Sequence, residues 1–288
     1  MNTVAKNRPG FISKTTLIKV IQCLFLIAGG ILFMAPLIWL VSNSFKENAQ
    51  IWTYPPVWIP KPVVFKHYLR LLDHHYLPMD TFIINSFKVT IGVLIGNIFS
   101  TVLVSYAFAR LKCKLKNFYF IVLLGTMMIP GQVILIPVFI LYKYLHWLNT
   151  FYALIVPAFF GNAFFIFLMR QFMMTIPYEL DESALIDGAS NLQILTRIIL
   201  PLCKPILITV GIFSFIWTWT DFYGPLIFLT KMDKMTLAVG ITLLQGQRVA
   251  EVGFMSAATV ISVLPLIILF FSAQKYFVEG ITLTGIKG

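Results

Sequence analysis

The sequence predicts an all-α membrane protein with six transmembrane helices, both termini in the cytoplasm, and a helical cytoplasmic loop between the fourth and fifth spans. The 288 residues are 59% hydrophobic and only 11% charged, with a mean hydropathy of +0.87, whereas a soluble domain carries roughly 25% charged residues. Six apolar windows are long enough to cross the hydrocarbon core, which takes about 20 residues. Lys and Arg gather between alternate windows, which is the distribution that sets membrane topology.

The six apolar windows account for most of the chain. They cover approximately residues 18–42, 83–109, 118–141, 150–169, 205–229 and 254–274. The first window follows a basic stretch, as the core of a signal peptide does, but it continues without a charge from Val20 to Phe45. A cleavable core is only about 7–15 residues long, so we expect this window to remain as a transmembrane helix. No internal repeat divides the chain, and residues 1–288 are predicted to form a single transmembrane domain.

The positive charges give the orientation. The densest cluster, "RLKCKLK" from Arg110 to Lys116, lies between the second and third windows, and positive residues favour the cytoplasmic side. Both termini and residues 170–204 then face the cytoplasm, and the longest outer segment covers residues 43–82. The net charge of +11 is not gathered into a basic patch with interleaved aromatic residues, so we expect membrane lipid and no nucleic acid as a partner.

Neither a disulfide framework nor a metal site is predicted. Cys23, Cys113 and Cys203 are far apart and odd in number, which indicates unpaired thiols. The adjacent histidines His74 and His75 have no third ligand at a suitable spacing. We therefore expect no metal ion and no cofactor on this chain.

An acidic stretch, "DESALIDGAS", stands out in the cytoplasmic loop. Glu179, Asp181 and Glu182 follow Pro177, which suits the first turn of a helix, and there their charges complement the helix dipole. Gly188 is suited to end that helix in the left-handed conformation. The first of the two helices in the loop is therefore predicted to be short and acidic.

A second helix is predicted directly after the first. Ser190 and Gln193 have the spacing of a capping box, and "NLQILTRIIL" continues until Pro201 and Pro205 interrupt it. The loop, about residues 176–202, is thus expected to be a rigid helical projection. A solvated loop whose carboxylates only cap a helix is the alternative, but the small residues beside the acids favour the close approach of another protein.

The spacing of the loop resembles a known motif. Glu182-Ser183-Ala184, Gly188, Ile198 and Leu200-Pro201 match the Glu-Ala-Ala loop of permease subunits of binding-protein-dependent ABC importers, with Ser183 in place of the first alanine. The segments "IFLMRQFMMTIPYELDESALIDGAS", "WTWTDFYGPL" and "QKYFVEGITLTGIKG" are similar to the carbohydrate-uptake branch, which includes the smaller permease subunit of the maltose importer. The resemblance covers nearly the whole chain.

This resemblance implies a role and a set of partners. The loop would carry a coupling helix that sits in a cleft of a cytoplasmic ATPase, through the residues Glu182, Ser183, Ala184, Asp187, Gly188, Ala189, Ile198, Leu200 and Pro201. The implied partners are a second homologous permease, two copies of the ATPase and an extracellular solute-binding protein, in a bacterial plasma membrane. ATP and Mg²⁺ would be used by the ATPase, because this chain lacks the Gly-rich loop that cradles phosphates, and we expect it not to be an enzyme.

A possible substrate pathway lies in "WTWTDFYGPL". Asp221 is the one acidic residue deep in a predicted span, where a carboxylate costs about 2.5–3.5 kcal/mol and usually faces a partner or water. Trp217, Trp219 and Phe222 offer aromatic faces beside it, which suit the apolar faces of sugar rings. Alternatively, Asp221 caps a broken helix before the Gly-Pro pair that follows, and the aromatic side chains only pack against their neighbours.

Other interpretations stay open at this point. The same kind of importer could carry a non-sugar solute, because the coupling loop reports the motor and not the cargo. A stand-alone secondary transporter or channel is also possible, although it calls for charged residues in several spans or for paired half-helices. In the third window, Pro130, Gly131 and Pro137 indicate either a hinge or a packing role.

Overall fold

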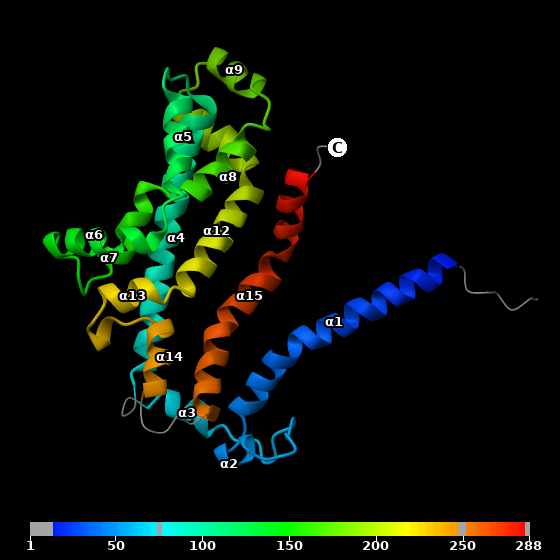
Figure 1. Cartoon of the computed structure of the whole chain (residues 1–288). Coiled ribbons are helices and arrows are strands. Elements are labelled where there is room, and N and C mark those ends of the chain that lie inside the picture. The colour runs from blue at the N-terminus through cyan, green and yellow to red at the C-terminus, as the bar shows by residue number, and fades with distance from the viewer. Residues whose placement is uncertain (1–13, 74–76, 247–251, 286–288) are drawn as a thin grey trace, which may run out of the picture. The chain divides into compact units, whose positions relative to one another are not determined.

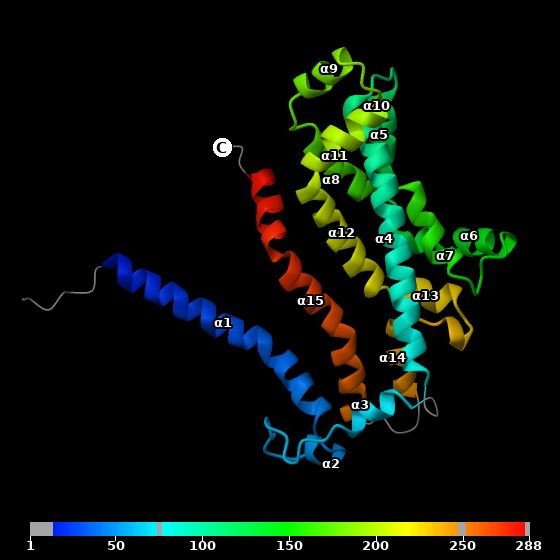
Figure 2. The same cartoon turned by 180° about the vertical axis from the view of Figure 1, so that it is seen from behind.

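The structure, a computed structural model, describes residues 14–73, 77–246 and 252–285. Helices follow one another through these ranges (Figures 1 and 2), which contain no strand, as predicted. The helices are α1 (Lys14–Ser44), α2 (Asn48–Ile51), α3 (Lys66–Leu71), α4 (Met79–Arg110), α5 (Lys116–Thr126), α6 (Gly131–Tyr144), α7 (Tyr152–Ile155), α8 (Ala163–Met173), α9 (Glu179–Ile186), α10 (Asn191–Ile194), α11 (Leu200–Leu202), α12 (Lys204–Trp219), α13 (Tyr223–Phe228), α14 (Leu237–Gly246) and α15 (Val252–Gly285). Two short 3-10 turns, η1 (Val156–Phe160) and η3 (Met232–Lys234), and one π-helical turn, η2 (Leu195–Ile199), join them.

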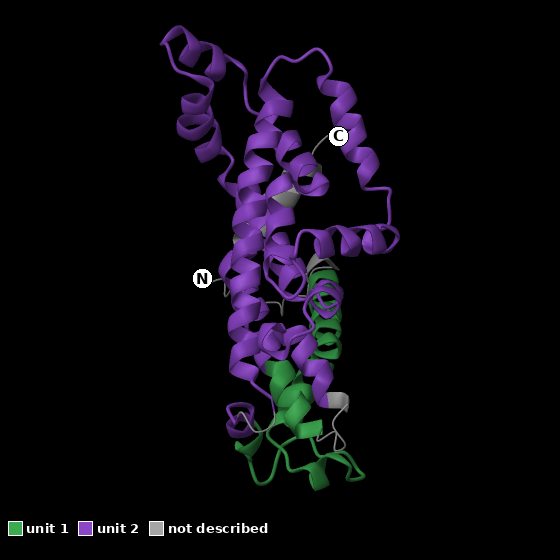
Figure 3. Cartoon of the chain, turned by 90° about the vertical axis from the view of Figure 1, so that its left-hand side faces the viewer, with its two compact units in different colours: residues 1–67, 251–260 green, residues 68–250, 261–288 purple. Residues whose placement is uncertain are grey.

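The chain divides into two compact units (Figure 3). The first contains residues 1–67 and 251–260, and the second contains residues 68–250 and 261–288. The single transmembrane domain predicted from the sequence stays a prediction. Each unit is described below by itself.

The first unit is built on α1, whose apolar side chains are exposed along the helix. The loop after α1 is tied back to the end of that helix by a fully buried lysine, Lys46. Its Nζ donates to Asn43 Oδ1 at 2.9 Å and lies 3.8 Å from the ring centroid of Trp39. His67 Nε2 is 2.8 Å from the carbonyl oxygen of Lys46. The adjacent pair His74 and His75 lies outside the described residues.

The second unit is organised around α4, along which α8 and α12 pack, with α7 and η1 also against it. Gly92 and Gly96 make the approach of α7 and η1 possible. A Cβ on Gly96 would lie 2.7 Å from Phe159 Cδ2, and one on Gly92 would lie 2.8 Å from Ile155 Cδ1. Two glycines four residues apart are the small-residue pattern by which transmembrane helices pack closely.

Four helical stretches in the described part of the chain are long and apolar enough to cross a membrane. They are Leu17–Ser44, Met79–Arg110, Tyr152–Met173 and Val252–Gln274, which match the first, second, fourth and sixth predicted windows. Two bent pairs would bring the number to six: α5 with α6, at 97°, and the segment Asn191–Leu202 with α12, at 80°. An all-helical membrane-type chain is confirmed, while the count of six spans and the cytoplasmic termini stay predictions.

The third predicted window is interrupted where its proline and glycine occur. α5 ends at Thr126, and α6 begins at Gly131 with Pro130 as its N-cap. A proline has no backbone N–H to continue the helix before it, so the chain changes direction here. Pro137, by contrast, lies inside α6. The interruption therefore falls at Pro130 and Gly131.

The fifth predicted window, 205–229, is not one helix. α12 ends at Trp219, and Asp221 and Phe222 lie in the break before α13. The reason is local, because Asp221 Oδ1 accepts a hydrogen bond from Gly224 N at 3.2 Å. This bond to the first turn of α13 starts a new helix direction. The structure thus contains the cap that the sequence offered as the alternative for Asp221.

Candidate functional site

The loop between α8 and α12, residues 174–203, is a helical projection that we call the acidic loop. Its first helix, α9, ends at Ile186, and Gly188, two residues further on, has φ of +81°. The Gly188 N–H donates to Leu185 O at 3.1 Å, and the Ala189 N–H donates to Ala184 O at 2.9 Å. This pair of bonds is the usual closure of a helix on a left-handed glycine. The predicted glycine stop is confirmed.

The second half of the acidic loop also follows the prediction. Ser190 Oγ accepts from Gln193 N at 3.4 Å, and Gln193 Oε1 accepts from Ser190 N at 2.7 Å, which completes the capping box. The helix continues through the π turn η2 and α11 until Cys203, where α12 takes a new direction. The inner face of the loop packs against α4 and α8 through Ala184, Ile194 and Ile199. The acidic loop is therefore a packed structure rather than a solvated connection.

One of the acidic residues is turned into the protein. Asp181 and Arg110, at the end of α4, are only 4% and 5% exposed, and Arg110 Nη1 lies 3.4 Å from Asp181 Oδ2. Arg110 Nη2 donates to the carbonyl oxygens of Met173 and Ile176, both at 2.8 Å. The Tyr178 hydroxyl donates to Arg110 O at 2.6 Å. A single guanidinium thus connects α4 to the end of α8 and to the first turn of α9.

The ionisation of Asp181 reflects this position. Burial raises the pKa of the Asp181 carboxyl above its ordinary value, and the charge of Arg110 opposes this rise. The sequence analysis missed the pair, because it counted Arg110 as a topological charge and Asp181 as an acid at a helix start. A usable signal was the three-residue spacing of Asp181 and Ala184, which places them on one face of α9, and that face is the buried one.

The structure brings together five of the nine residues that the importer resemblance implied for coupling. They line a hollow of about 370 Å³ on the acidic loop together with Gln193 and Arg197, and they are Ala184, Asp187, Gly188, Ala189 and Ile198. Glu182 and Ser183 are exposed on α9, and Leu200 and Pro201 belong to α11 and do not line the hollow. Ile186 and Leu192, which are 86% and 63% exposed, were not singled out from the sequence. Exposed apolar side chains on a rigid projection are suited to a protein partner.

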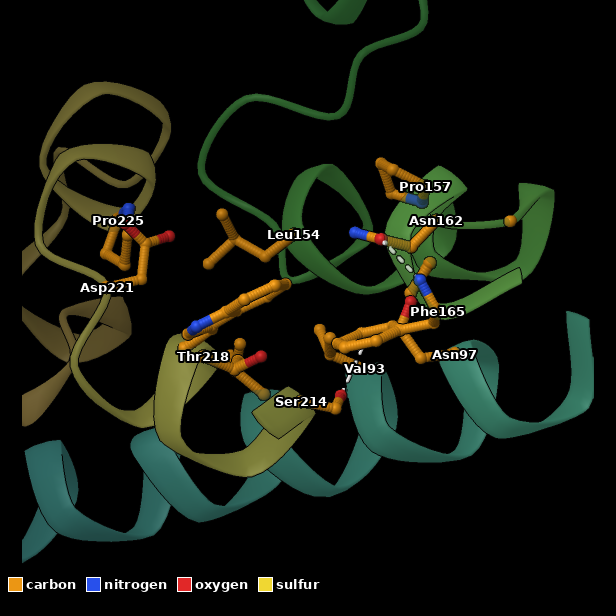
Figure 4. Close-up of a pocket in the computed structure, with 14 residues that line it drawn as sticks. Val93, Asn97, Leu154, Pro157, Asn162, Phe165, Ser214, Thr218, Asp221 and Pro225 are labelled. Carbon is orange, nitrogen blue, oxygen red and sulfur yellow. Dashed lines mark hydrogen bonds between the residues drawn. The ribbon is translucent and has the colours of Figure 1, made fainter. Parts of the chain in front are cut away.

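A second cavity, of about 420 Å³, lies within the second unit among α4, α7, η1, α8 and α12. We call it the central pocket (Figure 4). Its lining residues are Val89, Val93, Asn97, Leu154, Pro157, Ala158, Gly161, Asn162, Phe165, Ser214, Trp217, Thr218, Asp221 and Pro225. Asn97 Nδ2 donates to Ser214 Oγ at 2.9 Å, which joins α4 to α12 in the pocket wall. Apolar side chains and the polar groups of Asn97, Asn162, Ser214, Thr218 and Asp221 share the wall of the pocket.

Two of the four predicted pathway residues line the central pocket, and two do not. Trp217 and Asp221 are in its lining. Trp219 is 4% exposed, and its Nε1 donates to Ser262 O at 2.9 Å, so it joins α12 to α15. The Phe222 ring packs edge-on against Tyr223. The three aromatic residues predicted for the pathway therefore contact different parts of the protein.

Comparison with known proteins identifies the family. The family model described as "Binding-protein-dependent transport system inner membrane component" matches residues 89–283. The sulfoquinovosyl glycerol transport system permease protein SmoH of Agrobacterium fabrum is 31% identical and is covered, like this chain, over 100% of its length. The trehalose/maltose transport system permease protein MalG of Thermococcus litoralis is 32% identical, over 94% of this chain and 99% of the relative.

A solved structure shares the fold. The crystal structure of a bacterial ABC transporter involved in the import of the acidic polysaccharide alginate contains a chain with a TM-score of 0.80 and 24% identity. The likeness covers 94% of this chain and 100% of that one. The family match spans the acidic loop, the central pocket and most of α4, so the sites described above lie inside the shared region. The chain belongs to the family of binding-protein-dependent transport system inner membrane components.

Proposed function

We propose that this chain is the transmembrane permease subunit of an ATP-driven sugar importer, in which it forms half of the translocation pathway. The observation that carries the proposal is the acidic loop, a packed projection that gathers five of the nine residues implied for coupling around one hollow. The family description supports dependence on a solute-binding protein. The relatives that carry sugar names support sugar as the cargo.

In this proposal the acidic loop couples the permease to a cytoplasmic ATPase. The acidic loop would enter a cleft on the ATPase, where its exposed apolar side chains and the surface of the hollow would contact the partner. Glu182 would pair with a basic side chain at the rim of that cleft. The tie between Arg110 and the first turn of α9 would pass movement of the loop to α4. ATP hydrolysis then belongs to the partner, and this chain converts it into movement of helices.

Because this chain would form only half of the translocation pathway, further subunits are needed to complete the importer. A second, homologous permease would complete the translocation route, two ATPase copies would serve the two loops, and a solute-binding protein would deliver the cargo from outside. The acidic loop would face the cytoplasm of a bacterial cell, as the charge cluster from Arg110 to Lys116 indicates.

The coupling proposal is tested by co-purification of the ATPase. Glu182→Lys places like charges together at the contact and should weaken assembly by about 2 kcal/mol or more, so the ATPase should be lost from the purified complex. Asp233→Lys is the matched control, because Asp233 is an exposed acid beside Lys234, away from the acidic loop. A wild-type yield of ATPase with Glu182→Lys, or an equal loss with the control, contradicts the proposed contact.

The cargo proposal is tested by uptake. A strain that lacks this chain should lose the uptake of at least one tritiated oligosaccharide, and the wild-type gene should restore it. Loss of uptake of a non-sugar solute alone would assign a different cargo to the same machine. Transport by the purified chain without ATP or partners would replace the proposal with a stand-alone transporter.

A further inference from the structure

We propose that the central pocket is a saccharide subsite of this subunit, that Trp217 is its stacking platform, and that Asp221 makes it selective for uncharged sugars. This inference rests on the proposed function for its substrate class, and on the geometry of the pocket for its location and selectivity.

The platform is an indole held rigidly at the pocket. The Trp217 ring is stacked on Phe165, with centroids 5.1 Å apart and an angle of 20° between the planes. The ring of Phe164 also packs against the indole, with ring centroids 5.4 Å apart. Trp217 is nevertheless 46% exposed, so packing holds one part of the indole while another part remains accessible. A rigid, accessible aromatic face is the surface that the apolar C–H face of a sugar ring covers, because both lose contact with water.

Three polar groups of different kinds accompany the platform. Asn162 uses Oδ1 to accept from Phe164 N at 3.0 Å and Phe165 N at 3.3 Å as the N-cap of α8, which leaves its Nδ2 group as a donor. Thr218, whose hydroxyl can both donate and accept, also lines the pocket. Asp221 accepts hydrogen bonds from the backbone of Gly224 and Tyr223, and because a carboxylate offers about four acceptor positions, it can accept further hydrogen bonds from a ligand.

These groups flank the pocket rather than cluster at one point. Figure 4 shows Asp221 and Asn162 on opposite sides, with Leu154 between them and Thr218 below. Sugar hydroxyls both donate and accept, so a ring over Trp217 could donate to Asp221 on one side and accept from Asn162 on the other. The volume of about 420 Å³ lies within the range of about 300–1,000 Å³ for small-molecule sites.

The charge of the pocket sets the selectivity. Asp221 is the one ionisable side chain among the described residues that line it, and neither Lys nor Arg is in the lining. A uronate or sulfonate group would be brought out of water beside a like charge, which costs free energy with no compensating partner. The pocket therefore suits a neutral sugar and disfavours an acidic one.

The test uses uptake kinetics in cells that carry the full importer. The probes are tritiated maltotriose, arabinotriose, diacetylchitobiose and the acidic trigalacturonate, and membrane levels of each variant are measured by immunoblot. For the neutral probe that depends on this chain, Asp221→Asn should raise KM about tenfold, the scale of one hydrogen bond to a charged group. Trp217→Leu should also raise KM, because it removes the aromatic face on which the sugar ring stacks. Trp217→Phe should recover most of the loss, because it keeps an aromatic face. Asp233→Asn, which removes an exposed charge outside the pocket, is the control.

A second measurement locates the sugar. In the purified complex, Thr218→Cys should react with a thiol reagent, and the transported sugar should slow that reaction at least threefold after correction for the native thiols. Unchanged KM in Trp217→Leu and Asp221→Asn, or no protection at Thr218→Cys, overturns the subsite while the importer stands. If the uptake of trigalacturonate depends on this chain, the proposed selectivity for uncharged sugars is wrong. If no sugar depends on the chain, the proposed function fails as well.

Discussion

Replacing Arg110 with methionine should loosen the acidic loop while leaving the rest of the second unit folded. The variant keeps the length and the apolar stem of the side chain but removes the guanidinium that contacts Asp181 and donates to the carbonyl oxygens of Met173 and Ile176. Breaking a buried ion pair by removing one partner costs about 3–5 kcal/mol, because the other charge is left uncompensated. The two lost carbonyl contacts belong to the same network, so their cost is not simply added.

The loss should be visible as local opening. Since 1.4 kcal/mol is a factor of ten in an equilibrium constant, about 3 kcal/mol predicts at least a hundredfold loss of amide-exchange protection in the loop. The assay is hydrogen exchange with mass spectrometry on the full transporter in lipid nanodiscs, read on peptides that cover residues 174–190. Stimulation of the ATPase by the sugar-loaded binding protein should fall in parallel.

Two comparisons make the reasoning refutable. Lys112→Met also removes one positive charge, but Lys112, two residues after Arg110, is exposed. This variant should leave the amide-exchange protection of the loop unchanged. Asp181→Asn should cost less than Arg110→Met, because the Arg110 guanidinium keeps its hydrogen bonds to Met173 and Ile176 and because burial already disfavours the charged carboxylate. Wild-type protection in Arg110→Met, or equal losses in Arg110→Met and Lys112→Met, would show that the buried pair does not hold the loop.

Four further results are expected. Gly188→Val should cost about 1–3 kcal/mol of strain at the left-handed φ and lower uptake without lowering membrane insertion, whereas Gly188→Asn should retain uptake. Gly96→Leu should displace Phe159 and lower the yield of folded protein in a fluorescence-detected chromatography assay. Loop protection should fall as pH rises through the raised pKa of Asp181, because the folded form favours the protonated acid, and Asp181→Asn should abolish this dependence. A membrane-impermeant thiol reagent should modify Cys113 only after cells are permeabilised. Labelling of Cys113 in intact cells would show that the predicted orientation is inverted.

Local signals in the sequence predicted the acidic loop well. The stop at Gly188 and the capping box at Ser190 depend on backbone bonds within a few residues, and such bonds form wherever the surroundings allow a helix. The long apolar windows likewise marked most of the membrane-type helices, since length and composition are local properties. The same information did not reveal that α5 and α6 meet at 97°, because a proline marks a possible break without giving the angle.

Contacts between distant segments were beyond the sequence patterns used. The pairing of Arg110 with Asp181 joins residues 71 positions apart (181 − 110), and no spacing rule links the end of one helix to the start of another so far along the chain. The different positions of Trp217 and Trp219, however, could have been predicted from the sequence. Residues two apart point in different directions on a helix, and Trp217 and Trp219 both lie in the last turn of α12, so they face different neighbours. Reading the segment as a helix with faces, rather than as a cluster of aromatic residues, would have placed one tryptophan at the central pocket and the other in the packing against α15.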